Sequence, residues 1–166
     1  ERQSDARALA DLMLPKDPRS PAFFNKDGAA FLTALIQYLL EVAPPPHRTI
    51  RSIVNAIGSS THRFKADLVE PMARSRNPAI SGVANNVLGK SSTTGLPNLR
   101  DTLQSEMALW SDEGVLAATD FNEVDFRRLK DETTTVYIEV PFDRIDSYAP
   151  VFRVILQVDR AGAEPA

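Results

Sequence analysis

The residues whose types and order come closest to a chemical motif are Gly89, Lys90 and Ser91, because Gly-Lys-Ser is how a phosphate-binding loop ends. The full motif requires a glycine five residues before Gly89, and Ala84 stands there. Such a loop also follows a buried strand and opens a helix, whereas these residues follow a helical pattern over 77–88. The sequence therefore predicts no nucleotide site here, and it predicts that Lys90→Ala leaves folding and binding nearly unchanged.

No other set of residues has the composition of a catalytic or metal site. Cysteine is absent, which excludes disulfides, thiolate nucleophiles and zinc sites of the finger type. His47 and His62 are the only histidines, they are not at metal-ligand spacing, and neither lies in an apolar stretch. The sequence therefore predicts no catalytic residue, no metal site and no cofactor within the chain.

The charged residues define two surfaces by composition. The net charge of −3 over 166 residues implies no general attraction to nucleic acid or to an anionic membrane. Within this balance, residues 101–132 carry nine carboxylates against three cations. A solvated face is the favoured interpretation of such a stretch, and a docking surface is the alternative. If cargo binds through charged side chains, the candidate residues are the basic Arg63, Lys65 and Arg74 and the acidic Asp112, Glu113, Glu123 and Asp125.

The element that must hold the rest together is the stretch 28–42, which is apolar except for one line of polar residues. Thr33, Gln37 and Glu41 recur every four residues and so share one face of a helix. This stretch is too short and too polar to span a bilayer, which predicts a central helix in a soluble bundle, ended by the prolines that follow. Thr33 and Gln37 could orient a ligand, but bonds to neighbouring backbone groups explain them more simply.

Further helices are predicted from apolar spacing, caps and proline positions. The candidate N-cap residues are Ser4, Thr49, Asn77 and either Ser111 or Asp112. A chain of this length with 43% hydrophobic residues can bury one core. The predicted helices, besides the central one, are 4–14, 49–58, 61–73, 77–88, 96–110, a short one near 112–116, a turn at 124–129, and 147–159.

The pattern changes at Thr133. Residues 133–140, TTTVYIEV, are rich in β-branched and aromatic residues and are followed by Pro141, which predicts the one strand of the chain. A single strand forms no sheet, so this strand and the helix after it are typical of half of a βαβ unit. We therefore predict a mainly α chain, a bundle of about seven to eight helices over 1–132, followed by a strand and helix of an α/β domain over 133–166.

Three stretches resemble the TraG-like coupling proteins of type IV secretion systems: FFNKDGAAFLTALIQYLLEVAPPPHRTIRSIV, NPAISGVANNVLGKSSTTGLPNLRDTLQSEMALWSDEGVLAAT and DFRRLKDETTTVYIEVPFDRIDSYAPVFRVILQ. The last is the most specific, since the family has a strand of the form VY(I/L)xVP, then DR(I/L), then a helix beginning near YAP. Glu139 departs from the apolar residues usual in that strand. The resemblance implies a membrane-anchored hexameric motor with a RecA-like domain and an all-α domain inserted between its two nucleotide-binding motifs.

By this resemblance, the chain looks like that insert plus a returning strand and helix. Its lack of a starting Met suggests a piece of a longer protein. By the resemblance, ATP and Mg²⁺ belong to the parent motor, at the cytoplasmic side of the bacterial inner membrane, and the fragment itself is soluble, monomeric and not an enzyme. The implied function is recognition of cargo, either a protein effector or a relaxase. The alternative is a helical domain that contacts DNA; the low net charge disfavours it.

Overall fold

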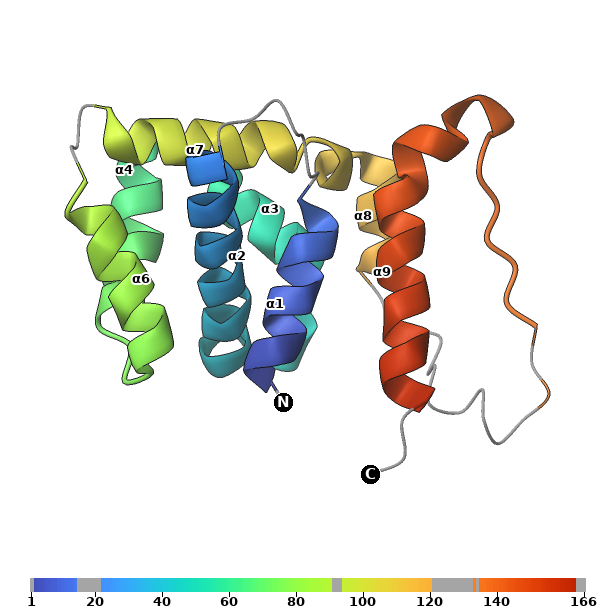
Figure 1. Cartoon of the computed structure of the whole chain (residues 1–166), viewed down its shortest axis with the longest axis horizontal. Helices are drawn as coiled ribbons and strands as arrows, with labels where there is room; N and C mark the ends of the chain where they lie inside the picture. The colour runs from blue at the N-terminus through green and yellow to red at the C-terminus, as the bar shows by residue number, and fades with distance from the viewer. Residues whose placement is uncertain (1, 15–21, 91–93, 121–132, 134, 164–166) are drawn as a thin grey trace.

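A computed structural model describes residues 2–14, 22–90, 94–120, 133 and 135–163, and these are mainly helical, as predicted (Figure 1). No strand occurs in these ranges, and none of their helices is long and apolar enough to cross a membrane. The elements are α1 (Arg2–Met13), α2 (Ala22–Val42), η1 (Pro45–His47), α3 (Ile50–Gly58), α4 (Thr61–Arg63), η2 (Phe64–Val69), α5 (Glu70–Ala73), α6 (Pro78–Leu88), α7 (Gly95–Glu106), η3 (Leu109–Ser111), α8 (Glu113–Thr119), η5 (Phe142–Arg144) and α9 (Ile145–Ala163).

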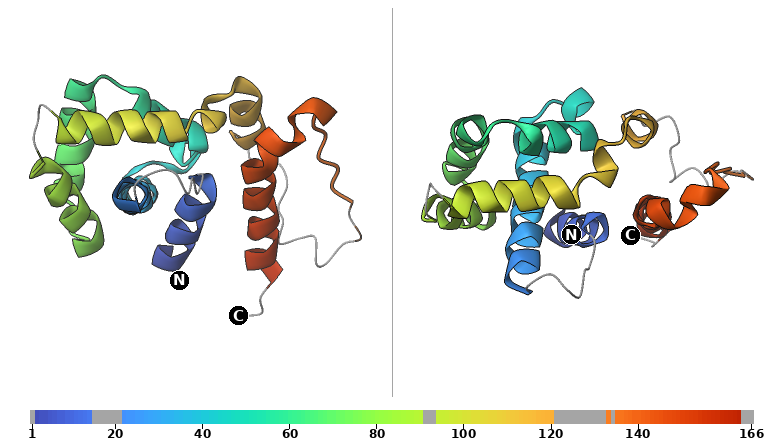
Figure 2. Two further views of the ribbon diagram at one scale, coloured as in Figure 1. Left: turned by 45° about the horizontal axis from the view of Figure 1, so that its top comes forward. Right: turned by 90° about the horizontal axis from the view of Figure 1, so that it is seen from above.

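Helix α2 is the centre of the bundle, as predicted. It lies between α1 and α6 and contacts both, and α7 crosses it (Figures 1 and 2). Phe31, Leu32 and Leu35 are fully buried. The helix begins six residues before the predicted start at residue 28, and its last turn is less covered than predicted. Leu40 and Val42 are 41% and 56% exposed, because burial at the end of a helix depends on how far its neighbours reach.

Two of the three residues in the polar line on α2 bond within the protein. Thr33 Oγ1 donates to the carbonyl of Ala29 at 2.7 Å, which confirms the simpler of its two interpretations. Glu41 accepts hydrogen bonds from Ser75 Oγ at 3.3 Å and from Asn77 Nδ2 at 3.1 Å, and so joins the end of α2 to the turn that precedes α6. The polar line is therefore largely structural, with Gln37 as its exception.

Large side chains from distant parts of the sequence meet in the core. The rings of Phe31 and Phe64 have centroids 5.4 Å apart and are tilted by 41°. Trp110 is fully buried, and its Nε1 donates to the carbonyl of Met13 at 2.8 Å. Because that carbonyl is at the last residue of α1, the indole both fills the core and satisfies an acceptor at a helix end.

The predicted helix 61–73 is one run made of α4, η2 and α5, in which Phe64, Leu68 and Met72 are buried as predicted. Its middle is π-helical, and the Glu70 amide bonds to the Lys65 carbonyl five residues back. Pro71 follows at once. A proline has no N–H to donate and its ring collides with the carbonyl four residues earlier, so we attribute the wider turn to Pro71.

Helix starts follow the predicted caps with one exception. Thr49, Asn77 and Asp112 each accept a hydrogen bond from a backbone amide in the first turn of the helix that follows. Ser4 is not a cap, because α1 already begins at Arg2. Short polar side chains are also tolerated inside a helix, and Ser4 stands at an exposed position of its first turn.

The predicted strand 133–140 is not seen. Residues 133 and 135–140 are neither helix nor strand, and the Tyr137 side chain is 84% exposed. The physical reason is that a strand needs a neighbour for its backbone groups, and the described ranges contain no other strand. Helix α9 begins two residues before the predicted start and extends past 159, and it packs along α1 with Val154 buried. The domain boundary between 132 and 133 stays a prediction, and the turn predicted at 124–129 lies outside the described residues.

Candidate functional site

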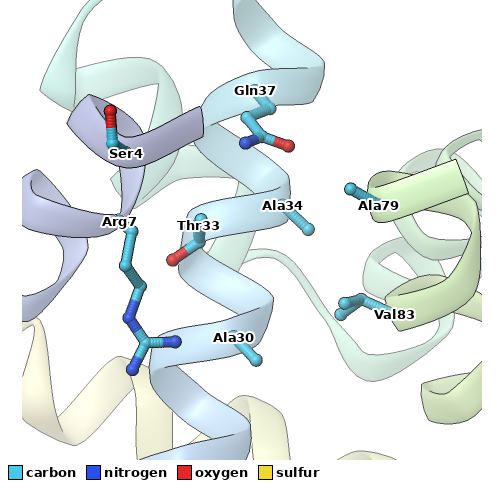
Figure 3. A pocket seen from close by; sticks show the side chains of 8 residues that line it. All are labelled: Ser4, Arg7, Ala30, Thr33, Ala34, Gln37, Ala79 and Val83. Atoms are coloured by element: carbon cyan, nitrogen blue, oxygen red, sulfur yellow. The ribbon is translucent and has the colours of Figure 1, made fainter. Parts of the chain in front are cut away.

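A pocket of about 710 Å³ opens over the face of α2 that carries Thr33 and Gln37 (Figure 3). Helix α2 forms its floor, α1 one wall and α6 the other. The floor and the α6 wall are built mainly from small side chains. The lining residues are Ser4 and Arg7 from α1, Ala30, Thr33, Ala34 and Gln37 from α2, and Ala79 and Val83 from α6.

A second pocket of about 390 Å³ continues this hollow along α2 and α6. It shares Ala30 and Val83 with the first, so the two are parts of one surface, which we call the α2 groove. Near its far end Lys90 Nζ contacts Asp27 Oδ2 at 2.5 Å, an ion pair of partly buried side chains. Gly89 and Lys90 therefore lie after α6 and close to the start of α2, while Ser91 is outside the described residues.

Gln37 is the unusual residue of the groove. It is only 8% exposed, yet its amide has no hydrogen-bond partner among the described residues. Its polar atoms are not sealed in the core, since the side chain lines the pocket and extends from α2 there (Figure 3). Among the described residues the buried side-chain atom without a partner is Glu106 Oε2, not an atom of Gln37, so the Gln37 amide reaches solvent through the pocket. Gln37 thus offers one donor and one acceptor group to anything that enters the groove.

Arg7 is the only charged residue among the described residues that line the larger pocket. Its Nε donates to Asp11 Oδ2 at 3.0 Å along α1, in a pair whose side chains are 47% and 39% exposed. Exposed pairs of this kind contribute little to stability, and the partner offsets part of the positive charge. The α1 wall of the groove is therefore weakly cationic.

The predicted basic residues lie elsewhere. Arg63, Lys65 and Arg74 are exposed along the run from α4 to the residue after α5, as the sequence predicts for a surface. None of them lines the α2 groove. Lys65 Nζ is 4.0 Å from Glu70 Oε1, so part of this charge is balanced within the run itself.

Of the predicted acidic residues, Glu113 bonds to another helix. It accepts from Arg51 of α3 through both carboxylate oxygens, at 2.9 and 3.3 Å, and Arg51 Nε also donates to Asp120 at 2.6 Å. Hydrogen bonding to Arg51 lowers the pKa of Glu113, and the same bonds to Glu113 and Asp120 raise the pKa of Arg51. This forked contact ties α8 to α3.

Asp112 also has internal partners. It caps α8 and accepts a hydrogen bond from Tyr148 Oη of α9 at 3.3 Å. A hydrogen bond to Tyr148 raises the pKa of Arg144. Glu123 and Asp125 lie outside the described residues. The two acidic candidates that are described thus hold helices together, and sequence patterning missed this because their partners are 36 and 62 positions away.

Two further observations concern ionisable groups. Among the residues with described positions, no group of three or more His, Asp or Glu side chains is close enough to hold a metal ion. Glu106, the last residue of α7, has a buried Oε2 with no hydrogen-bond partner in the described part of the chain. Burial raises the pKa of the Glu106 carboxyl.

Comparison with known proteins identifies a family. The family model described as Type IV secretory system Conjugative DNA transfer matches residues 1–163. A search of curated proteins and a search of solved structures each found no match. The family match covers almost the whole chain, including the bundle that forms the α2 groove and the C-terminal helix α9. The chain therefore belongs to the type IV secretory system conjugative DNA transfer family.

Proposed function

We propose that this chain is the cargo-recognition part of a type IV secretion coupling protein, which binds a secreted protein effector or a relaxase. The α2 groove carries the proposal, because it is a long hollow between helices with a small-residue floor and polar groups at defined places. Clefts that combine apolar lining with a few polar groups are the usual sites of ligand and peptide binding. The groove is built from α1, α2 and α6, which fits the assignment of cargo to the helical part.

A DNA-contacting helical domain is the second candidate, and the family's description favours it. Each phosphate contact requires Lys or Arg, and binding then weakens steeply with salt. The exposed cations Arg63, Lys65 and Arg74 lie on one run, but Lys65 is near Glu70 and the chain as a whole has a net charge of −3. We therefore rank protein cargo first.

We infer that residues 133–140 and α9 connect the helical part to a nucleotide-binding domain outside this chain. Tyr137, Phe142 and Ile145 are 84%, 90% and 44% exposed, which leaves apolar surface for such a partner. ATP and Mg²⁺, hexamer formation and the place at the cytoplasmic side of the inner membrane belong in this proposal to the parent motor. The fragment, by the same proposal, is monomeric and does not hydrolyse ATP.

The test of cargo recognition is a residue-by-residue NMR titration of the chain with labelled cargo signal peptides and, separately, with duplex and single-stranded DNA. We expect peptide to shift the amides of α1, α2 and α6 and DNA to give no saturable change. Binding of DNA alone, or peptide shifts confined to residues 135–156, would reject cargo recognition and favour the rival.

The test of the ATP proposal is calorimetry with Lys90→Ala beside the unmodified chain. Lys90 contacts Asp27 and follows a helix rather than a strand, so we expect no ATP binding by either protein and little change in folding. Saturable micromolar binding of ATP that disappears in Lys90→Ala is the contrary outcome.

A further inference from the structure

We propose that the α2 groove receives an amphipathic helix of the cargo that presents small apolar side chains to α2 and α6 and a carboxylate to Arg7, with Gln37 as its hydrogen-bonding anchor. This inference rests on the proposed function and specifies the chemistry of the partner. It is carried by three observations: the spacing of the lining residues, the unpartnered Gln37 amide, and the sign of the charge at the rim.

The lining residues follow the periodicity of helix packing. Ala30 and Ala34 of α2 are four residues apart, and so are Ala79 and Val83 of α6. Rows of side chains four residues apart form the ridges and grooves into which a second helix packs, and small residues let its backbone approach closely. The α2 groove therefore has the pattern of a helix-accepting surface on two of its sides.

Gln37 distinguishes this surface from an ordinary hollow between helices. More than nine-tenths of the residue is buried, and its amide reaches the pocket without a partner in the described chain (Figure 3). The amide is open to water in the free chain, and a partner that fills the groove would remove that water. A buried amide without a partner is costly, so Gln37 favours a partner that brings a polar group of its own to this depth.

The charge at the rim of the groove determines which charge a bound helix should carry. Arg7 is the one charged residue in the described lining of the larger pocket, while Asp27 and Lys90 neutralise each other in the adjoining one. A carboxylate on the incoming helix therefore meets a guanidinium that Asp11 only partly offsets. Charges at a rim mostly set selectivity and encounter rate, so we expect a modest preference for acidic over basic helices.

The first experiment compares Gln37→Met with Gln104→Met, a matched change at an exposed position of α7. We expect Gln37→Met to leave the melting temperature of the free chain nearly unchanged and to weaken peptide binding about fivefold, the loss of one hydrogen bond. Gln104→Met should leave both unchanged. A structural role for Gln37 instead gives a clearly lower melting temperature and overturns the assignment, as does unchanged peptide binding.

The second experiment measures fluorescence anisotropy with labelled Ala/Leu-based helical peptides of about 12 residues, identical except for one Glu, Gln or Lys. We expect affinity in the order Glu, Gln, Lys, with about a threefold step for the charge. Arg7→Gln should abolish the preference, whereas Arg63→Gln, an equal change of charge outside the groove, should preserve it. Absence of saturable binding by all three peptides, or an unchanged preference in Arg7→Gln, contradicts the proposal.

The third experiment locates the peptide by blocking the groove. Ala79→Phe places a ring on the α6 wall, and Asn85→Phe places the same ring on an exposed position of α6 that lines neither pocket. We expect only Ala79→Phe to reduce binding. If natural cargo binds equally well to both variants, the groove assignment fails while cargo recognition stands. If only DNA binds, the proposed function fails as well.

Discussion

The helical part, described within residues 2–120, and the C-terminal part, described within residues 133–163, differ in the burial of large aromatic side chains. In the helical part Phe31 and Trp110 are fully buried, whereas in the C-terminal part Phe142 and Tyr137 are 90% and 84% exposed. The two parts belong to one family match. An apolar pattern therefore favours burial, but the side chains are buried only where a neighbouring element is present to cover them.

Helix α9 stands between these extremes. Its Tyr148 and Val151 pack against the core, and Val154 is 8% exposed, while Leu156 on another face is 60% exposed. Its contacts run to α1, and the Tyr148 hydroxyl reaches Asp112 at the start of α8. One face of α9 thus belongs to the bundle, and the other is available to a partner.

The largest expected effect is that of Trp110→Ala, which we compare with Tyr137→Ala. Trp110→Ala should lower the free energy of unfolding by about 3–5 kcal/mol, because it empties a buried site and leaves the Met13 carbonyl unpaired. Tyr137→Ala should change it by less than about 0.5 kcal/mol. Urea denaturation measures both. Comparable losses would mean that residues 135–140 are buried in solution and would break the comparison.

The next effect compares a fully buried leucine with an exposed one. Leu35→Ala on α2 should cost about 2–5 kcal/mol, since the side chain is fully buried. Leu156→Ala on α9 should cost less than about 0.5 kcal/mol in this chain. The same denaturation series tests the pair. A cost for Leu156→Ala close to that of Leu35→Ala would indicate that the exposed face of α9 has found a partner, for example a second copy of the chain.

A smaller effect should show whether α9 unfolds independently of the other helices. Val154→Ala removes two buried methyl groups, a loss of about 1–2 kcal/mol at roughly 0.8 kcal/mol each. We expect the loss to appear as faster hydrogen exchange of α9 amides, while amides of α2 stay protected. Uniformly faster exchange throughout the chain would show that α9 unfolds only together with the bundle.

The smallest effect is a pH-dependent change of melting temperature, which should have opposite signs when Glu106 and Glu113 are replaced. Burial raises the pKa of folded Glu106 above its ordinary value of 4.5, so its favourable contribution is full below that pH and is lost as pH rises through the folded pKa. Glu106→Gln should therefore raise the melting temperature at pH 7 and not at pH 4. Arg51 lowers the pKa of Glu113, so Glu113 stabilises above pH 4.5 and loses this effect as pH falls through the folded pKa.

Glu113→Gln is thus the matched control, with a slightly lower melting temperature at pH 7 and a difference that fades on acidification. Differential scanning fluorimetry at several pH values gives both curves. The same sign for the two variants at pH 7 would contradict the assigned environments.

The features that depend on neighbours along the chain could be predicted from the sequence. Apolar spacing identified the buried line Phe64, Leu68 and Met72, and short polar residues identified three of the four proposed caps. These signals are local, because a helix places residues three and four apart on one face and its first amides need acceptors nearby. The resemblance carried by longer stretches agrees with the family match.

Which polar residues have partners could be seen only in the packed helices, because most of these partners are distant in the sequence. Glu113 and Asp120 bond to Arg51 more than 60 positions away, so two acidic residues that resemble a free surface are structural. Gln37 belongs to the same polar line as Thr33, yet it alone opens into the α2 groove without a partner among the described residues. Spacing on a helix fixes the direction of a side chain, whereas the helix that it meets, or fails to meet, is fixed by contacts between distant segments.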